Sequence, residues 1–61
     1  MQVGDLVKFN DLAEPFEGQT GVILRSEMDQ SDTDWFEILS QGQLIVVPEY
    51  QVTLMWSSHN N

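Results

Sequence analysis

The chain has 61 residues and a formal net charge of −8, because ten Asp and Glu residues stand against only two basic residues, Lys8 and Arg25. Such a surface repels the phosphate backbone that dominates nucleic-acid affinity, which excludes direct binding of DNA or RNA as the expected function. The absence of cysteine excludes disulfides and thiolate metal sites, and we expect a cytoplasmic location. No apolar stretch approaches the ~20 residues of a membrane-spanning helix, and we expect no secretory signal.

The first predicted strand runs from Val3 to Phe9. In an extended chain Val3, Val7 and Phe9 lie on one side. Gly4 followed by Asp5 predicts a bend or bulge near the start of the strand. We expect Val7 and Phe9 to lie in the core.

A loop of about ten residues follows, from Asn10 to Gln19, because this segment is polar and contains a proline and a glycine. The loop carries three acidic residues, Asp11, Glu14 and Glu17. The second predicted strand, Thr20–Glu27, begins beside Gly21, where a neighbouring backbone or side chain is expected to come close. Ile23 is the first choice for the core in this strand.

The segment Asp34–Pro48 predicts a β-hairpin, since two runs of strand-forming residues are separated by Ser-Gln-Gly. A hydrophilic link, Met28–Thr33, leads into it. Gly42 can take the positive φ that closes a short hairpin loop. The segment Pro48–Gln51 then predicts a single 3-10 turn, because proline cannot donate to a strand ladder.

The last predicted strand is Val52–Trp56, and the polar residues 57–61 predict a flexible tail. Residues 1–56 therefore form one domain. The expected fold is all-β, a small five-stranded barrel with a 3-10 turn before the last strand, because a strongly bent barrel removes exposed strand edges. The expected core residues are Val7, Phe9, Ile23, Ile38 and Val52.

Two sets of motifs resemble SH3-like barrels. Val3-Gly4-Asp5-Leu6-Val7-Lys8-Phe9 followed by Gly18-Gln19-Thr20-Gly21-Val22-Ile23 resembles the opening of KOW-like and other bacterial and phage SH3-like barrels. The later segments Asp34-Trp35-Phe36, Gly42-Gln43 and Val47-Pro48-Glu49-Tyr50-Gln51-Val52 are similar to the Trp-Trp, Gly and Pro-x-x-Tyr-Val succession of peptide-binding SH3 domains. The resemblance spans roughly residues 3–55 and is greatest to small proteins of tailed bacteriophages. It implies an SH3-like fold, which hosts many unrelated functions.

The resemblance also implies a candidate groove. Trp35 and Pro48 would border a site for an extended proline-rich peptide, and the acids of the first loop would meet an Arg or Lys of that peptide. The alternative is that Trp35 is a packing residue, a lid at one end of the barrel or a half-buried cross-strand partner.

Two apolar runs, Val22-Ile23-Leu24 and Leu44-Ile45-Val46-Val47, predict outward-facing aliphatic side chains. Successive residues of a strand face opposite ways, so one interior cannot accept all of them. Leu44 and Val46, with Met55 or Trp56, would form a patch that binds another protein or a second copy of the chain. Local bulges, or cover from the first loop, are the alternative.

No metal, cofactor or catalytic site is expected. Asp29, Asp32, Asp34 and Glu37 do not match the spacing of a calcium loop, so they indicate a solvated acidic segment. Every acid lies in a polar sequence context, which argues against a carboxylate with a raised pKa. His59 is the only histidine, and it lies in the tail with no fixed partner.

We therefore interpret the chain as a non-catalytic protein-binding module, of the kind that a phage encodes as an accessory protein to bind a host or viral protein. The predicted anchors are Trp35, Leu44, Val46, Tyr50 and Trp56. The predicted rim, which would steer a basic partner and weaken with salt, is Asp11, Glu14 and Glu17. The alternatives are an acidic DNA mimic that inhibits a nucleic-acid-binding protein and a small self-associating structural subunit.

Overall fold

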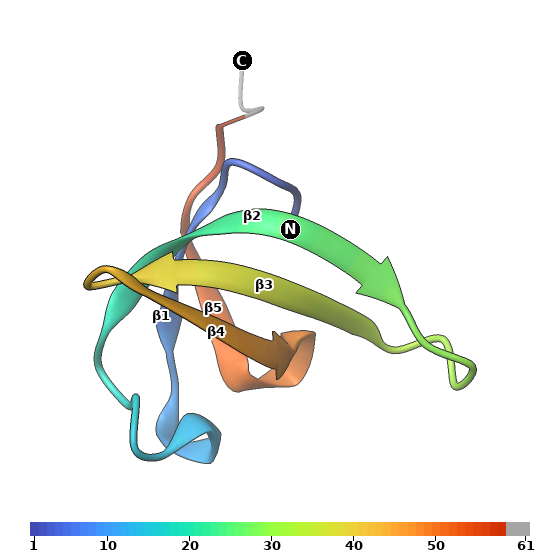
Figure 1. Ribbon diagram of the computed structural model, residues 1–61, viewed down its shortest axis with the longest axis horizontal. Helices are drawn as coiled ribbons and strands as arrows, with labels where there is room; N and C mark the ends of the chain where they lie inside the picture. Colours follow the sequence, from blue (N-terminus) through green and yellow to red (C-terminus); the bar gives the residue numbers. More distant parts are fainter. Residues whose placement is uncertain (59–61) are drawn as a thin grey trace.

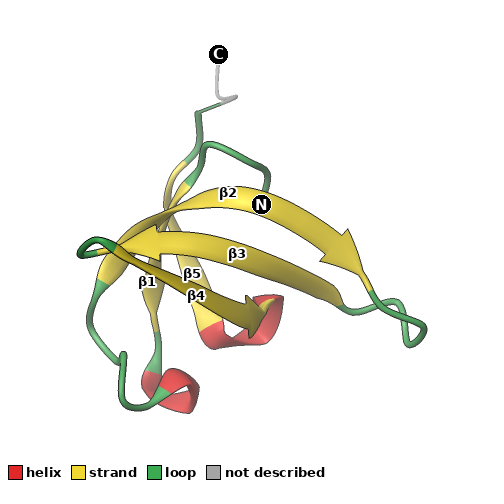
Figure 2. Ribbon diagram, in the orientation of Figure 1, coloured by secondary structure: helices red, strands yellow, loops and turns green. Residues whose placement is uncertain are grey.

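The computed structural model describes residues 1–58, which fold into one antiparallel sheet of five strands (Figure 1). The sheet order is β4-β3-β2-β1-β5. The strands are β1 (Leu6–Phe9), β2 (Thr20–Met28), β3 (Asp34–Ser40), β4 (Gln43–Pro48) and β5 (Val52–Trp56). Two 3-10 turns, η1 (Asp11–Ala13) and η2 (Glu49–Gln51), lie near one end of the sheet (Figure 2). The all-β prediction is confirmed, and within residues 1–58 the edge strands β4 and β5 do not pair to close the sheet.

β2 organises the sheet, because it is the longest strand and pairs with different neighbours along its length. Its beginning pairs with β1, where Val22 lies opposite Leu6, and the rest of it pairs with β3. The register between β2 and β3 shifts between Ile23 and Arg25, and a bulge of this kind bends a strand and increases its twist. β2 therefore curves across the fold, and the β3–β4 hairpin lies in front of β1 and β5 in Figure 1.

The core prediction is confirmed, since none of the five expected residues is more than 5% exposed: Val7, Phe9, Ile23, Ile38 and Val52. Alternate residues of β3 and β4 and one residue of η1 complete the cluster: Ala13, Phe36, Ile45 and Val47. Burying one such large side chain contributes about 1.5–3 kcal/mol. This one-sided burial stabilises the sheet and determines which side of it faces outward.

The first strand is shorter than predicted, because Gly4 has a φ of 94° and the backbone N–H of Asp5 donates to the carbonyl of Gln2 in a turn. Extended structure begins at Leu6. The expectation that Val3 shares the inner side with Val7 is wrong, since Val3 is 50% exposed.

The first loop contains η1, which the sequence analysis did not predict. Asn10 caps this turn, because its Oδ1 accepts a hydrogen bond of 2.9 Å from the backbone N–H of Leu12. The Nδ2 of the same side chain donates to the carbonyl of Tyr50 at 2.9 Å, and the backbone N–H of Asn10 donates to the carbonyl of Gln51 at 3.0 Å. One asparagine thereby ties the first loop to η2.

Two glycines occupy positions that only glycine suits. A Cβ on Gly21 would lie 2.6 Å from both Cγ2 of Ile38 and the carbonyl oxygen of Leu39, which confirms the expected close approach at this residue. In the hairpin loop Gln41 and Gly42 have φ values of 52° and 76°. These values fit the two-residue type I′ turn, which needs positive φ at both central positions, and they confirm the predicted role of Gly42.

Asp5 is only 2% exposed, so the inference from the polar sequence context that no carboxylate is buried is wrong for this residue. Its Oδ2 accepts a hydrogen bond of 2.8 Å from the backbone N–H of Gln2. Its Oδ1 accepts from the backbone N–H of Ser58 at 2.9 Å and from the Ser58 hydroxyl at 3.1 Å. Such donors offset the cost of burying a carboxylate. Ser58 belongs to the predicted tail, of which residues 59–61, with His59, lie outside the described residues.

Candidate functional site

The candidate site is the outward face of β2, β3 and β4. Residues paired across antiparallel strands point to the same side of a sheet. Ile38 is buried and pairs with Ile23 and Ile45, which marks the inner side. The alternate β3 residues Trp35 and Leu39 therefore point outward, and so do their partners on β2 and β4.

A row of apolar side chains crosses the outward face. Leu39 pairs with Val22 on one side and with Leu44 on the other. The same register continues across the sheet, because Val22 pairs with Leu6 and Leu6 pairs with Trp56. We call these five residues the apolar row. It has one residue on each of the five strands: Leu44, Leu39, Val22, Leu6 and Trp56. Leu44 and Trp56 at its two ends are 59% and 60% exposed.

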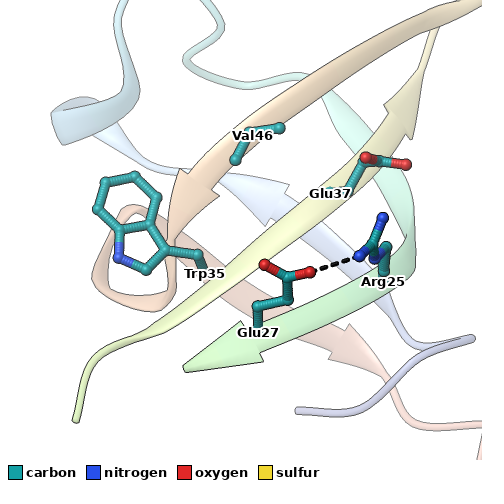
Figure 3. Close-up of a pocket in the computed structure, with 5 residues that line it drawn as sticks. All are labelled: Arg25, Glu27, Trp35, Glu37 and Val46. Carbon is teal, nitrogen blue, oxygen red and sulfur yellow. Dashed lines mark hydrogen bonds and ion pairs between the residues drawn. The ribbon is translucent and has the colours of Figure 1, made fainter. Parts of the chain in front are cut away.

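Next to the apolar row lies a shallow hollow of about 160 Å³ on the outward face. It is lined by side chains from all three strands: Arg25, Glu27, Trp35, Glu37 and Val46. Figure 3 shows the Trp35 ring at one end of the hollow and Arg25 at the other, with Glu27 between them in an ion pair with Arg25. Glu37 points outward from β3 beside Val46 of β4.

Trp35 is held by the loop between β2 and β3. Its indole Nε1 donates to Oδ2 of Asp29 at 2.7 Å. Oδ1 of Asp29 accepts hydrogen bonds from the backbone N–H groups of Ser31 and Thr33, at 2.7 Å and 3.1 Å. The Trp35 indole, and after it the Thr33 and Ser31 amides, hold the pKa of the Asp29 carboxyl below its ordinary value, because they stabilise the charged form. The aromatic wall of the hollow is therefore held in a defined orientation.

The structure brings three of the predicted anchors together on the outward face: Trp35, Leu44 and Val46. Trp56 lies at the far end of the apolar row on β5. Tyr50 lies apart from them on η2 and is 60% exposed.

The acids proposed as a rim lie elsewhere. Asp11, Glu14 and Glu17 are exposed on the loop between β1 and β2, whose η1 turn lies beside η2. Glu17 borders a second hollow, of about 360 Å³, that also contacts Lys8 and Met55. The outward face of β2–β4 has its own acids instead, Glu27 and Glu37.

Sequence reasoning did not single out Leu39 and Arg25, which complete the face, or the contact that Asp29 makes with Trp35. Val22 lies in an apolar run that was expected to carry outward-facing side chains, and it is 38% exposed. Leu39 could have been found, because it alternates with the buried residues of its strand as Trp35 does. The others depend on cross-strand register and on a loop contact, for which a single sequence carries no signal.

In residues 1–58 no three His, Cys, Asp or Glu residues are grouped so that they could hold a metal ion. The polar atoms of side chains buried in this range all have hydrogen-bond partners. Among the same residues no helix has the length and apolar character to cross a membrane.

Comparisons with known protein families, with curated proteins and with solved structures found no match.

Proposed function

We propose that this chain is an SH3-like barrel that works as a non-catalytic protein-binding module, with the outward face of β2–β4 as its binding surface. The strand order, the long first loop and the η2 turn before β5 support this fold assignment. The role of a phage accessory protein that binds a host or viral protein rests on the sequence resemblance alone.

The observation that carries the proposal is the set of exposed apolar side chains in register on neighbouring strands. Leu39, Leu44 and Val46 are 42%, 59% and 59% exposed, and each is adjacent to another across a strand pair or along β4. Apolar groups that stay in water within one contiguous area are typical of interaction surfaces. Trp35 adds an aromatic side chain of the kind that often dominates binding energy.

Electrostatics favour a basic partner. The chain carries a net charge of −8, and a field of this sign accelerates association with a positively charged surface. Because exposed charges are screened within about 10 Å at 0.1 M salt, association should become slower as the salt concentration rises.

Affinity capture from extracts of the native host tests the proposal. Leu44→Asp places a charge in the apolar row, and Trp35→Ala removes the aromatic wall. The matched control is Leu12→Asp, since Leu12 is 61% exposed on η1 and lies off the outward face. A partner should be retained by wild type and Leu12→Asp and lost by the two face variants. Retention of every partner by the face variants would refute the proposal.

The two alternative functions predict different experimental results for this protein. A DNA mimic requires competition with DNA for a basic protein, and this competition should fall when Asp11, Glu14 and Glu17 are changed to the corresponding amides. A self-associating subunit requires a dimer or larger species in sedimentation at high concentration, and a monomer would exclude it.

A further inference from the structure

Strand β4 has one edge that no other strand covers. The loop of the β3–β4 hairpin has two residues, so its flanking pair, Ser40 and Gln43, exchanges hydrogen bonds across the turn. Hydrogen-bonded and non-hydrogen-bonded pairs alternate along an antiparallel ladder. Ile45 and Val47 therefore bond to β3, whereas the backbone N–H and C=O groups of Leu44 and Val46 point away from it. We call these four groups the open edge.

No group within residues 1–58 forms a hydrogen bond with the N–H and C=O groups of the open edge. β4 is the last strand in the sheet order, and Leu44 and Val46 make no backbone or side-chain hydrogen bond to other parts of the described chain. The other edge strand is better protected, because the N–H of Val52 donates to the carbonyl of Glu49 and the β1–β5 register is interrupted between Leu6 and Val7.

The open edge also lacks the devices that usually protect an edge strand. Natural sheets place charges, bulges or prolines there to prevent pairing with another chain. The register of β4 with β3 is continuous, and the strand has no charged residue and no proline before its last position, Pro48. The two residues of the open edge, Leu44 and Val46, also carry the exposed aliphatic side chains of the proposed binding surface.

Unpaired N–H and C=O groups spaced two residues apart fit an extended backbone, which would join the sheet as a sixth strand. The charges near β4 define the chemistry of that strand. Glu37 lies beside Val46 on β3 with no ion-pair partner among residues 1–58, and Glu49 follows Pro48. Of the two cations, Arg25 on β2 lies opposite Glu37 but forms its ion pair with Glu27, so these three side chains together keep a negative charge. Lys8 lies on β1, beyond β3 and β2.

We infer that the open edge of β4 binds an extended, lysine- or arginine-rich segment of the partner protein, with alternate apolar side chains against Leu44 and Val46. The inference rests on the proposed protein-binding function and specifies its mode. A second copy of this chain fits less well, because two chains of charge −8 repel each other.

The probe for this inference is a capped seven-residue peptide of alternating lysine and valine, with a glutamate–valine peptide as the charge control. In the free protein the Leu44 and Val46 amides should exchange rapidly with solvent, and the lysine peptide should slow their exchange at least about tenfold, because each forms a ladder hydrogen bond. The glutamate peptide should leave exchange unchanged. A lysine peptide N-methylated at alternate residues on its pairing edge should bind at least about tenfold more weakly.

Val46→Pro tests the backbone from the other side. Because the N–H of Val46 belongs to the open edge, proline at this position removes that donor without breaking a hydrogen bond to β3. Proline is tolerated at such edge positions. We expect it to weaken peptide binding about tenfold, whereas Val46→Thr, which keeps the N–H and the branched shape, stays within about threefold of wild type. The N-methylated peptide gives the same information if Val46→Pro does not fold.

Failure of the inference and failure of the proposed function are distinguishable. If host capture depends on Leu44 but the lysine peptide does not protect the two amides, the edge inference is overturned and the function stands. Equal binding of the N-methylated and normal peptides also overturns it. If the amides are protected without peptide in a concentration-dependent dimer, the occupant is a second copy and the inference is wrong. Loss of both peptide binding and Leu44-dependent capture rejects both proposals.

Discussion

The indole N–H of Trp35 donates a hydrogen bond of 2.7 Å to Oδ2 of Asp29, which lies six residues earlier in the loop before β3. The other oxygen of that carboxylate accepts hydrogen bonds from two backbone amides of the same loop, those of Ser31 and Thr33. One carboxylate therefore orders the loop and orients the aromatic wall of the hollow. Asp29 is thus a positioning residue for the proposed binding face.

We expect the Asp29 carboxyl to titrate below its ordinary pKa of 3.8, because the Trp35 indole and the loop amides stabilise its charged form. Its pKa is lower in the folded chain than in the unfolded chain. The stability that it contributes is therefore present above about pH 4 and is lost as the pH falls through the lowered pKa. NMR titration should show the Trp35 indole resonance moving with the Asp29 carboxyl. In Asp29→Asn the indole resonance should not follow that titration, and an Asp29 pKa of 3.8 or higher would contradict the assignment.

Gly21→Ala should lower the free energy of unfolding by about 1–3 kcal/mol, because the added Cβ overpacks against Ile38 and the backbone of Leu39. Urea unfolding followed by tryptophan fluorescence measures the change. The control is Thr20→Ala at the neighbouring exposed position, for which a change within about 0.5 kcal/mol is expected. Equal effects of the two substitutions would show that the close approach at Gly21 is not tight.

Gln41→Asn should raise the free energy of unfolding by a few tenths of a kcal/mol, since Asn-Gly is the preferred pair for a type I′ turn and Asn tolerates positive φ better than Gln. Gly42→Ala should lower it by about 1 kcal/mol, because alanine resists the φ of 76° at this position. Thermal unfolding of the two variants measures both effects. Opposite signs from these would argue against the turn type.

Deletion of residues 57–61 should destabilise the fold by about 1–3 kcal/mol, because Oδ1 of the buried Asp5 then loses both donors from Ser58. Deletion of residues 59–61 alone keeps these donors and serves as the control. Chemical unfolding compares the two truncations. If both have the same stability as the full chain, the Ser58 contacts contribute nothing to the fold.

Ile45→Ala should cost about 2–5 kcal/mol and Leu44→Ala less than about 1 kcal/mol. The two residues are neighbours on β4, but Ile45 is 5% exposed in the core and Leu44 is 59% exposed on the outward face. Unfolding measurements on both variants test which side of β4 faces the interior. A larger loss for Leu44→Ala would reverse the assigned faces and remove the apolar row.

The strands and the core could be predicted because their signals are local. Side chains alternate in a strand, so Ile38 and Ile45 could be assigned to the interior from sequence spacing, and Gly42 marks a turn through its own backbone freedom. The predicted last strand, Val52–Trp56, agrees with β5 in both its bounds. η1 was missed although Asn10, a typical N-cap residue, accepts from the N–H of Leu12 only two residues later. The second contact of Asn10, to the carbonyl of Tyr50, joins residues 40 apart and could not be predicted from the sequence.

The sequence by itself determined that this chain is an acidic, all-β protein whose interior is built from alternate apolar residues, because composition and strand periodicity depend only on neighbours in the chain. Only the tertiary structure decided that Leu6, Val22, Leu39, Leu44 and Trp56 form one row and that the edge of β4 stays open. It likewise decided that Asp5 is buried against Ser58. These relationships depend on strand register and sheet order, which join residues far apart in the chain and are determined by the packing of the whole core.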